Sequence, residues 1–399
     1  MLISVCDIIL SMNFGKEKQK VEKIFVGMSG GVDSSVTALL LKNAGHNITG
    51  FFIKTWQPDY IECTWKEDRL DAMRVCAQLD IPFITLDLES EYKKFVIDYF
   101  LSEYKNNRTP NPDVMCNKYI KFGAFLDYAM SNGADYIATG HYAKIVKSSK
   151  IEKDSTERYE LFAAEDKTKD QSYFLYQIQK ENLSRILFPL ANLEKSQIRK
   201  IAEENNLWVA DKKDSQGICM LGGDVSVKDF LIRELNPEKG QTKNELGEII
   251  GEHKGVILYT IGERHDFVIN QKNSDKNENN TPYFVIEKDL ENNVLIVSQD
   301  KLTQSVIYSK DNNLNNPDSN NKIYLEEVNI LIDINNKKEL EIFKNQVLAR
   351  SRYRGELFEI KYNAEKQFFT TNSNILCVSG QSLVMYDKNN RVLGGGVIK

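Results

Sequence analysis

Strand-like and helix-like apolar patterns alternate along the first half of the chain. A run at 23–26 is followed by a glycine turn and then by an apolar helical period at 36–41. Further strands are predicted at 47–54, 81–86, 135–139 and 159–164, and further helices at 68–79, 91–105, 118–130 and 194–205. Strands and helices that alternate at these intervals predict an α/β fold, with a parallel sheet covered by helices on both faces.

The pattern changes at about Gly240, where short strand-like segments separated by turns take over. These segments lie at 256–259, 283–287, 293–298, 347–354, 356–362 and 382–386. Such spacing predicts a small β-barrel or sandwich. Two asparagine-rich stretches, 270–281 and 311–322, interrupt the pattern, and their composition is that of solvated loops. A chain of 399 residues has room for two or three domains.

Composition narrows the class of protein. The chain is 41% hydrophobic and 27% charged, as in ordinary globular proteins. Its net charge of -5 means that a nucleic-acid partner would be met by local basic patches. No apolar run approaches the roughly 20 residues of a membrane span, so no membrane partner is expected. The six cysteines form no Cys-x-x-Cys pair, which disfavours a disulfide framework and a metal site and favours reduced thiols in the cytoplasm.

The segment Gly27–Ser35 carries the strongest chemical signal. It reads Gly-Met-Ser-Gly-Gly-Val-Asp-Ser-Ser between an apolar strand and a helix, which predicts an anion-binding helix N-terminus. Gly30 and Gly31 would let the backbone approach a ligand, and Ser29, Ser34 and Ser35 would supply hydroxyl donors. A glycine turn before any helix can look similar. The Ser-Gly-Gly-x-Asp-Ser order, however, matches the PP-loop ATP pyrophosphatases, which split ATP into AMP and pyrophosphate.

The segment 108–117 displays a cysteine in a polar setting. Its two prolines predict a rigid turn just before the helix at 118–130, with Asp113 and Cys116 at a fixed separation. A helix N-terminus stabilises a thiolate, so Cys116 is a candidate reactive thiol. A buried structural cysteine is the commoner case, but a polar, proline-stiffened loop is a poor place to bury one.

A second candidate thiol, Cys219, follows Lys212 and Lys213 in a polar turn that contains Gly217. Nearby ammonium groups lower the pKa of a thiol. Sequence spacing does not place Cys219 beside Cys116, yet two positively flanked cysteines in a reduced protein point to sulfur or redox chemistry.

Three arginines stand out in the C-terminal half. On a strand, Arg350, Arg352 and Arg354 would share one face while Tyr353 would occupy the other. Such a row could follow a phosphate backbone. A solvated strand face with acidic neighbours explains the spacing equally well.

Taken together, the motifs resemble one family from Lys23 onward, the bacterial-type tRNA-specific 2-thiouridylases, also called tRNA-uridine 2-sulfurtransferases. The resemblance rests on Gly27–Ser35, Thr109–Lys118, Ala138–Tyr142, Lys169–Tyr176, Asp214–Cys219 and Leu393–Gly396, in this order. It implies an N-terminal extension without a fold role at 1–22, a PP-loop catalytic domain at 23–220, a small central domain at 221–282 and a C-terminal tRNA-binding β-barrel at 283–399.

The resemblance also implies roles for individual residues. Cys219 would carry a persulfide, Cys116 would be the partner nucleophile, and Asp113 would act as an acid/base or positioning group. The residues implied to bind ATP are Gly27, Met28, Ser29, Gly30, Gly31, Val32, Asp33, Ser34, Ile53 and Gly140. Asn111, Pro112 and Asp113 would contact the flipped-out wobble uridine. The remaining residues implied to contact tRNA are His141, Lys169, Asp170, Gln171, Arg352, Tyr353 and Gln381.

The implied reaction is ATP-dependent 2-thiolation of the uridine at tRNA position 34. ATP would adenylate the base O2, a poor leaving group, with Mg²⁺ accompanying ATP and no protein site assigned to the metal. Persulfide sulfur would then replace the adenylated oxygen, and Cys116 and Cys219 would end as a disulfide. The implied partners are tRNAs with Lys, Glu and Gln anticodons and a persulfide donor, either a cysteine desulfurase or a sulfur relay protein.

The chain departs from the family pattern in three places. Gly262–Asp266 reads Gly-Glu-Arg-His-Asp where the family often has Gly-Gln-Arg-Lys-Gly, which lowers the local positive charge. Ile53 replaces a usual Met, and Gln216 replaces a common Thr. Two other functions remain open from the residues: an amide-forming PP-loop ligase, which leaves both cysteines unexplained, and a non-catalytic tRNA-binding protein, which leaves the intact loop, Asp113 and the cysteines unexplained.

Overall fold

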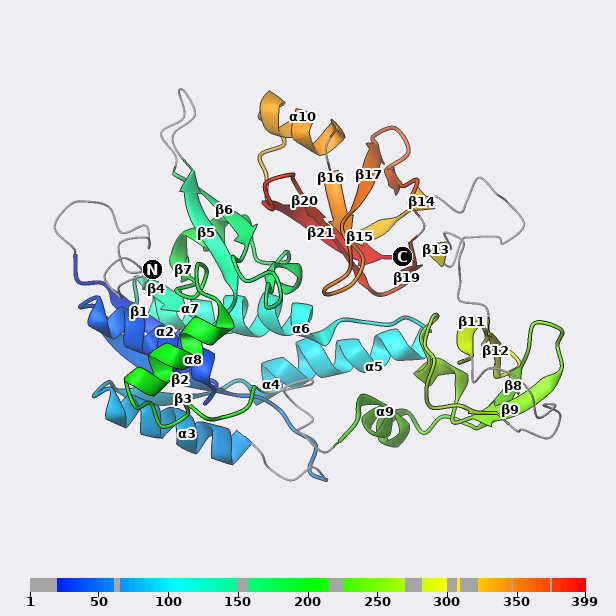
Figure 1. The fold of residues 1–399 in the computed structure, drawn as a ribbon, viewed down its shortest axis with the longest axis horizontal. Coiled ribbons are helices and arrows are strands. Elements are labelled where there is room, and N and C mark those ends of the chain that lie inside the picture. Colours follow the sequence, from blue (N-terminus) through cyan, green and yellow to red (C-terminus); the bar gives the residue numbers. More distant parts are fainter. Residues whose placement is uncertain are drawn as a thin grey trace.

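The protein has three successive parts, which Figure 1 shows as a helix-covered sheet, a small central domain and a barrel-like C-terminal sheet. In this computed structural model the described residues are 20–60, 65–148, 157–214, 225–269, 282–299, 307–308, 322–345, 347–373 and 375–399. Residues 1–19 of the extension predicted at 1–22, and the asparagine-rich stretches other than Lys322, lie outside these residues.

The N-terminal domain is built on a five-stranded sheet of order β3-β2-β1-β4-β7. Neighbouring strands pair in parallel throughout, as the alternating pattern predicted. Its strands are β1 (Lys23–Gly27), β2 (Asn47–Lys54), β3 (Phe83–Asp87), β4 (Tyr136–Ala138) and β7 (Ile186–Leu187). The carboxyl ends of β1 and β4 therefore meet at one edge, where ligands bind in sheets of this type.

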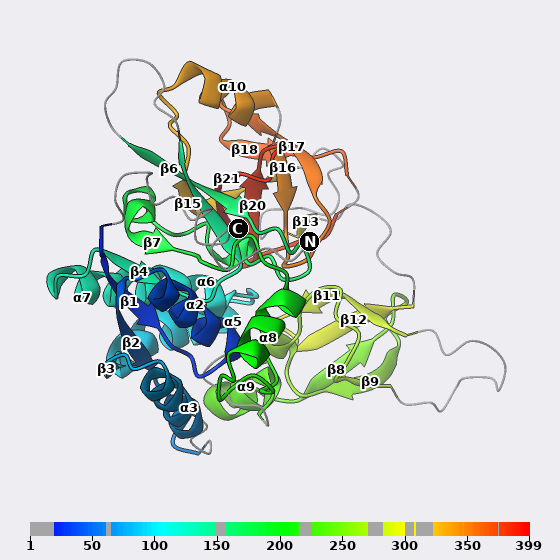
Figure 2. The ribbon, with the colours of Figure 1, turned by 60° about the vertical axis from the view of Figure 1, so that its left-hand side comes forward.

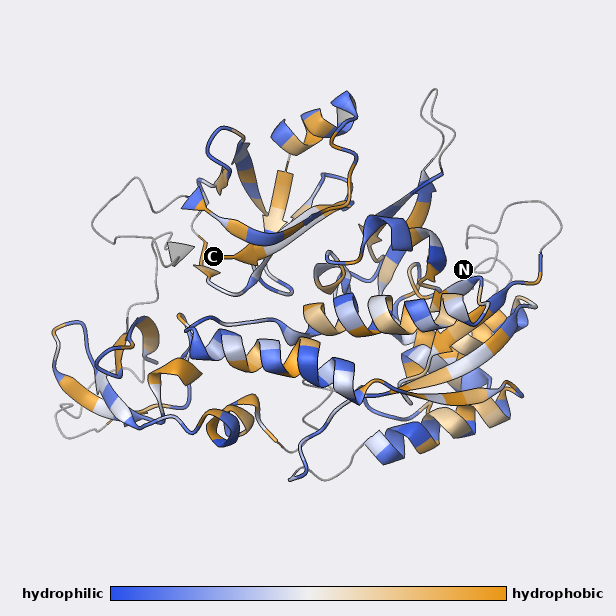
Figure 3. Ribbon diagram, turned by 180° about the vertical axis from the view of Figure 1, so that it is seen from behind, coloured by the Kyte–Doolittle hydropathy of each residue, from blue (hydrophilic) through white to orange (hydrophobic). Residues whose placement is uncertain are grey.

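Helices cover both faces of this sheet. One layer contains α2 (Val32–Asn43), α3 (Trp65–Gln78) and α8 (Lys195–Glu204). The other contains α4 (Glu89–Tyr92), α5 (Asp98–Lys105), α6 (Pro112–Met115) and α7 (Phe125–Ser131), joined by the π-helical segments Lys93–Ile97 and Cys116–Ala124. Side chains alternate along β1, so Phe25 enters one core while Ile24 and Val26 enter the other. Figure 3 shows apolar residues gathered on the strands and on one side of the helices.

The central domain is a five-stranded sheet of order β10-β9-β8-β12-β11 beside one helix, α9. Its elements are α9 (Val227–Leu235), β8 (Gly240–Lys243), β9 (Ile249–His253), β10 (Val268–Ile269), β11 (Phe284–Asp289) and β12 (Val294–Ser298). The predicted strand at 256–259 is wrong, because Gly255 with φ +133° interrupts the extended chain and a 3₁₀-helix, Val256–Leu258, follows. The expected domain boundary at 282 falls within this sheet, since β12 pairs with β8.

The C-terminal domain is a seven-stranded sheet of order β14-β18-β17-β16-β20-β21-β15. Its elements are β14 (Lys322–Ile323), β15 (Leu325–Ile330), α10 (Lys337–Asn345), β16 (Val347–Arg350), β17 (Phe358–Asn363), β18 (Phe368–Thr370), β20 (Ser382–Tyr386) and β21 (Val392–Ile398). The two ends of the order, β14 and β15, are separated in the chain by one residue, so the sheet nearly closes on itself (Figure 2). β13 (Ile307–Tyr308) pairs separately with β19 (Cys377–Val378).

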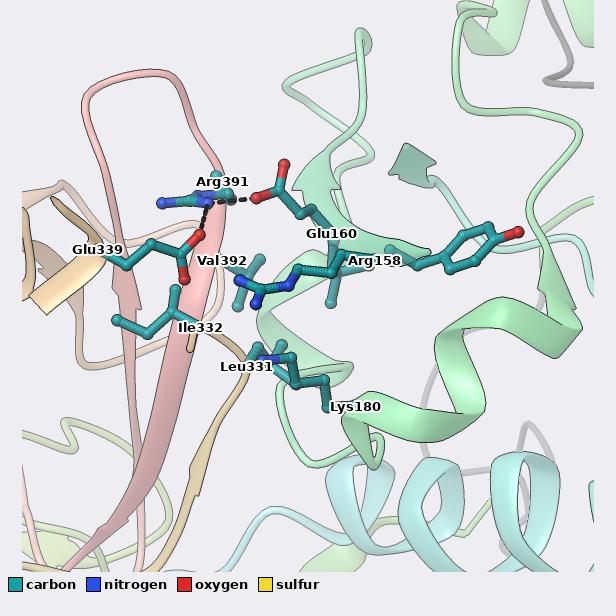
Figure 4. A pocket seen from close by; sticks show the side chains of 10 residues that line it. Arg158, Glu160, Lys180, Leu331, Ile332, Glu339, Arg391 and Val392 are labelled. Carbon is teal, nitrogen blue, oxygen red and sulfur yellow. Dashed lines mark hydrogen bonds and ion pairs between the residues drawn. The ribbon is translucent and has the colours of Figure 1, made fainter. Parts of the chain in front are cut away.

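A cluster of charges joins the barrel to the N-terminal domain. The hairpin β5 (Ala143–Ser148) and β6 (Arg158–Ala163) faces β21, and Arg391 is paired with Glu160, Glu339 and Asp387. Figure 4 shows Arg391 between Glu160 and Glu339 at the rim of a pocket. No candidate site residue lines this pocket. The pocket therefore belongs to the contact between the two domains.

Candidate active site

The loop after β1 has the geometry of an anion site. The strand ends at Gly27 and α2 begins at Val32, so only a tight turn separates them. Gly30 has φ +77°, and an added Cβ would lie 2.2 Å from the backbone oxygen of Asp68. Only glycine fits there. No side chain caps α2, so the N–H groups of its first turn are directed at the space in front of the loop.

The hydroxyls of three serines hold the turn in shape. Ser34 Oγ donates to the Gly31 oxygen at 3.1 Å and accepts from the Ser29 N–H at 3.2 Å. Ser35 is fully buried, and its hydroxyl donates to the Gly31 oxygen at 2.8 Å. Ser29 Oγ accepts from the Gly31 N–H at 3.3 Å and lies 3.2 Å from Ser34 Oγ. Of the three residues, Ser29 is the exposed one, so its hydroxyl can also face a ligand.

The end of β4 lies against the same loop. A Cβ added to Gly140 would sit 2.8 Å from the backbone nitrogen of Ser34. Tyr142 donates from its hydroxyl to Asp33 Oδ1 at 2.7 Å. Ile53 is half-buried on β2, the strand beside β1. The structure thus brings together loop residues and Gly140 from separate parts of the sequence.

Lys195, at the first position of α8, faces this loop. Its Nζ lies 2.7 Å from Asp33 Oδ1 and 2.8 Å from Asp214 Oδ1, and its side chain is 13% exposed. Lys169 and Arg199 also reach Asp214, each at 2.8 Å. Burial alone raises the pKa of Asp214, but hydrogen bonds from Lys169 and Lys195 outweigh it and hold the pKa at about 2. The result is a cluster of cations beside the anion site.

Sequence reasoning missed Lys195, Arg199 and the part that Asp214 plays as their acceptor. One signal could have found the lysine. A cation at the first position of a helix faces the positive end of the helix dipole, which is unfavourable unless carboxylates compensate. Asp33 and Asp214 supply that compensation here.

The proline-rich segment forms a helix start rather than a turn before one. Asn111 caps α6, with Oδ1 accepting from the Asp113 and Val114 N–H groups, and Pro112 occupies a first-turn position where proline is favoured. The prediction that Cys116 is displayed at a helix N-terminus is therefore wrong. Cys116 opens a π-helical segment and is only 5% exposed. Such segments are frequent at functional sites.

Burial and the charge of Lys121 affect the pKa values of both Asp113 and His141. Burial raises the pKa of Asp113, and the charge of Lys121 opposes this. Burial also lowers the pKa of His141 well below its usual value, and the same lysine adds to the effect. His141 packs between Phe122 and Phe188, and its Nδ1 is 2.8 Å from the Thr139 hydroxyl. The imidazole is consequently neutral at physiological pH.

Comparison with known proteins identifies the family. Residues 22–223 match the model described as the tRNA methyl transferase HUP domain, and residues 228–299 match the tRNA methyl transferase PRC-barrel domain. A tRNA-specific 2-thiouridylase MnmA of Streptococcus thermophilus is 40% identical over 383 residues, which covers 94% of this chain and 95% of the relative. The Streptococcus mutans protein of the same name is 40% identical over 382 residues, with the same two coverages.

The chain belongs to the MnmA family. Among solved structures, the U34-tRNA thiolase NcsA from Methanococcus maripaludis aligns with 58% of this chain and 73% of its own at 15% identity, with a TM-score of 0.35. The fold predicted from the sequence is confirmed: a parallel-sheet domain, a central domain and a nearly closed antiparallel barrel-like sheet.

The segment Lys169–Tyr176 of this MnmA-family chain is hydrogen-bonded to the C-terminal barrel. Asp170 is 4% exposed, and its carboxylate accepts from the Ala164 N–H, from Ser172 and from Arg350. Tyr173 and Tyr176 both donate to Ser382 of the barrel. Gln171 Oε1 accepts from the Tyr142 N–H at 3.0 Å. Asp170 and Gln171, which the resemblance assigns to tRNA contact, thus bond to protein groups in this structure.

The three arginines do not form a row on one strand. β16 ends at Arg350, which is paired with the buried Asp170, and a turn follows in which Arg354 has φ +57°. The strand-face prediction is wrong because this turn ends the alternation. Arg352 and Arg354 are exposed, whereas Tyr353 packs on Phe174 with 4.6 Å between ring centroids.

That turn lies close to the Cys116 segment. Asn117 donates from Nδ2 to the Phe174 oxygen at 3.1 Å, on the residue whose ring contacts Tyr353. Gln381 donates from Nε2 to the Thr109 oxygen at 2.7 Å. Residues from the barrel and from the proline-rich segment are thereby brought together.

Cys219 and the rest of 215–224 lie outside the described residues. Asp214, at the edge of that gap, is held by the cation cluster. Within the described part of the chain, no group of three His, Cys, Asp or Glu side chains is arranged to hold a metal ion. The described helices include none that is both long and apolar enough to cross a membrane.

Proposed function

We propose that this protein catalyses the ATP-dependent 2-thiolation of uridine 34 in tRNA. The observation that carries the proposal is the combination of family membership across nearly the whole chain with an intact PP-loop at the carboxyl end of β1. The domain-model descriptions mention methyl transfer, but the relatives matched over 94% of the chain are 2-thiouridylases. We therefore adopt sulfur transfer as the reaction.

ATP would bind with its phosphates at the N-terminus of α2. The backbone N–H groups of the first turn, the Ser29 hydroxyl and the ammonium of Lys195 are the donors available there. In the structure Lys195 contacts Asp33, and a phosphate oxygen would give this ammonium a stronger negative partner. Mg²⁺ would accompany ATP, and we assign no protein ligands to it.

The uridine would lie at the proline-rich segment. Its O2 would attack the α-phosphate, release pyrophosphate and leave AMP attached to C2 through oxygen. Asn111 and Asp113 stand at the start of α6, where they would position the base. Because burial raises the pKa of Asp113, its carboxyl is suited to hold or move a proton nearer neutral pH than an exposed aspartate.

Sulfur would arrive as a persulfide on Cys219. Its terminal sulfur attacks C2, and the C2–O bond breaks so that AMP leaves with the former O2. The Cys116 thiolate attacks Cys219 Sγ and breaks its bond to the transferred sulfur, which leaves that sulfur on C2 and forms the Cys116–Cys219 disulfide. In the alternative order the same attack comes first and releases sulfide, which then attacks C2 in place of the persulfide. An external reductant then restores both thiols. The donor of the persulfide would be a cysteine desulfurase or a sulfur relay protein.

The tRNA would be held by the barrel and the exposed turn at Arg352. The family name supports tRNA as the substrate. The Lys, Glu and Gln anticodon types, the remaining tRNA contacts and the cytoplasmic location stay predictions.

Serine substitution of each cysteine tests the proposal. Cys116→Ser and Cys219→Ser should each abolish 2-thiouridine formation while tRNA binding in a filter assay stays within about threefold of wild type, because only the sulfur steps are removed. An amide-forming ligase would keep its full activity in both variants. Unchanged thiolation in both would overturn the sulfur-transfer mechanism.

A further inference from the structure

Thr109 is bonded to both downstream domains. Its N–H donates to the Ser379 oxygen at 2.9 Å, and its own oxygen accepts from Gln381 Nε2 at 2.7 Å. Its hydroxyl lies 3.0 Å from the hydroxyl of Thr260 in the central domain. Figure 1 shows the segment between α5 and α6 passing between the barrel and the central domain.

The contact with the barrel is one backbone against another. Gly380 has φ +89°, and a Cβ added there would lie 2.7 Å from the Thr109 nitrogen and 2.9 Å from its oxygen. Both the positive φ and the lack of room for a Cβ therefore require glycine at position 380. Arg108, the residue before Thr109, also contacts the barrel. Its guanidinium donates to the Ile398 oxygen at 3.4 Å and is paired with Glu326.

The chain that leaves Thr109 is stiff. Pro110 and Pro112 each fix φ, so few backbone angles between Thr109 and α6 can absorb a displacement. Asn111 adds a cap to the first N–H groups of that helix. Movement of Thr109 is consequently passed on to Asn111 and Asp113.

We infer that Thr109 is a positioning residue, through which the barrel and the central domain fix the segment 111–116 relative to the bound tRNA. This inference rests on the proposed function. It also gives Gln381 a second task, because its amide orders the protein segment whether or not it contacts tRNA. When the barrel holds a tRNA, Asp113 and Cys116 would then lie at a fixed position relative to the bound uridine.

Gly380→Ala is the main test, with Gly247→Ala as its control. Gly247 lies in the turn between β8 and β9 and also has a positive φ, +81°, but an added Cβ there would meet nothing within 4 Å. Both variants place alanine in a conformation that favours glycine, and only Gly380→Ala also displaces Thr109. Displacing a positioned group by about 1 Å can slow a reaction 10²-fold, so Gly380→Ala should lower the single-turnover thiolation rate at saturating tRNA by about that factor. The Kd for tRNA should stay within about threefold of wild type, and Gly247→Ala should keep a near-wild-type rate.

Thr109→Val keeps the test decisive if Gly380→Ala does not fold. It removes the hydroxyl bonded to Thr260, and we expect about a fivefold slower saturated rate, as for the loss of roughly 1 kcal/mol. Thr109→Ser, which retains the hydroxyl, should restore the rate. Gln381→Ala should likewise slow the saturated rate, whereas a residue that only contacts tRNA would change Kd alone.

Two results separate the inference from the function on which it rests. If the wild-type protein forms 2-thiouridine and the folded variants match it at saturating tRNA, Thr109 does not position the segment. If the wild-type protein forms none, the proposed function itself fails.

Discussion

Lys195 offers the sharpest test of the nucleotide site. Its ammonium is 2.7 Å from Asp33 Oδ1 in the PP-loop, and its side chain is only 13% exposed. Lys195→Met keeps the length and apolar stem of the side chain but removes the charge. The variant therefore isolates the electrostatic contribution of the ammonium to ATP binding.

The size of the effect follows from the contact. A hydrogen bond to a charged group contributes about 1.5–3 kcal/mol. A tenfold change corresponds to about 1.4 kcal/mol, so the KM for ATP should rise roughly 10- to 100-fold in the variant. The Kd for tRNA should stay within about threefold of wild type, because the contacts of Lys195 are with Asp33, Asp214 and the Tyr142 ring and not with the exposed turn at Arg352.

The assay is 2-thiouridine formation at saturating tRNA with ATP varied. Arg199→Met is the matched control, since Arg199 reaches Asp214 at 2.8 Å and otherwise donates to the backbone oxygens of Ala210 and Lys212 rather than to Asp33. We expect its KM for ATP to stay within about threefold of wild type. The reasoning is refuted if Lys195→Met keeps a wild-type KM, or if both variants raise KM equally.

Two other substitutions probe the site, and a third probes the contact between the barrel and the N-terminal domain. Gly140→Ala should lower kcat/KM for ATP at least about tenfold with tRNA binding intact, because its Cβ would sit 2.8 Å from the Ser34 nitrogen; equal kcat/KM values would contradict the close approach. Asp113→Asn should lower thiolation about 10²- to 10⁴-fold, and an active variant would exclude proton transfer there. Since burial raises the folded-state pKa of Asp113, the wild type loses stability as pH rises from the unfolded pKa through the folded one; thermal melts should show Asp113→Asn more stable above this window and equal below it. Arg391→Met leaves the carboxylates of Glu160 and Glu339 without their shared cation and should cost about 3–5 kcal/mol in denaturant unfolding, so a change under about 1 kcal/mol would refute its part in joining the domains.

Local sequence patterns were sufficient to predict the strand, loop and helices around the proposed nucleotide site. The apolar run before Gly27 and the helical period after the loop depend on neighbours in sequence, and β1, the turn and α2 formed as predicted. Gly45, with φ +83° just beyond α2, stands where glycine commonly ends a helix. The helix predicted at 194–205 is present as α8, and it begins with a capping box.

The errors arose where distant contacts or competing local rules decided the outcome. Two prolines suggested a turn, yet Pro112 in the first turn of a helix is favourable, so the helix that carries Cys116 begins earlier and buries it. Arg350 was predicted to be a solvated or RNA-facing side chain, but its partner Asp170 is far away in sequence. Lys195 depends in the same way on Asp33 and Asp214, and only its unfavourable helix position was visible locally.

The most direct test of the central claim is one incubation of protein, ATP, Mg²⁺, a persulfide source and tRNA whose uridine 34 carries ¹⁸O at O2. Mass spectrometry then measures both products. Our account predicts 2-thiouridine together with AMP that contains one ¹⁸O atom, since the adenylated oxygen leaves with the phosphate. AMP without the label, or labelled tRNA that gains no sulfur, would contradict it.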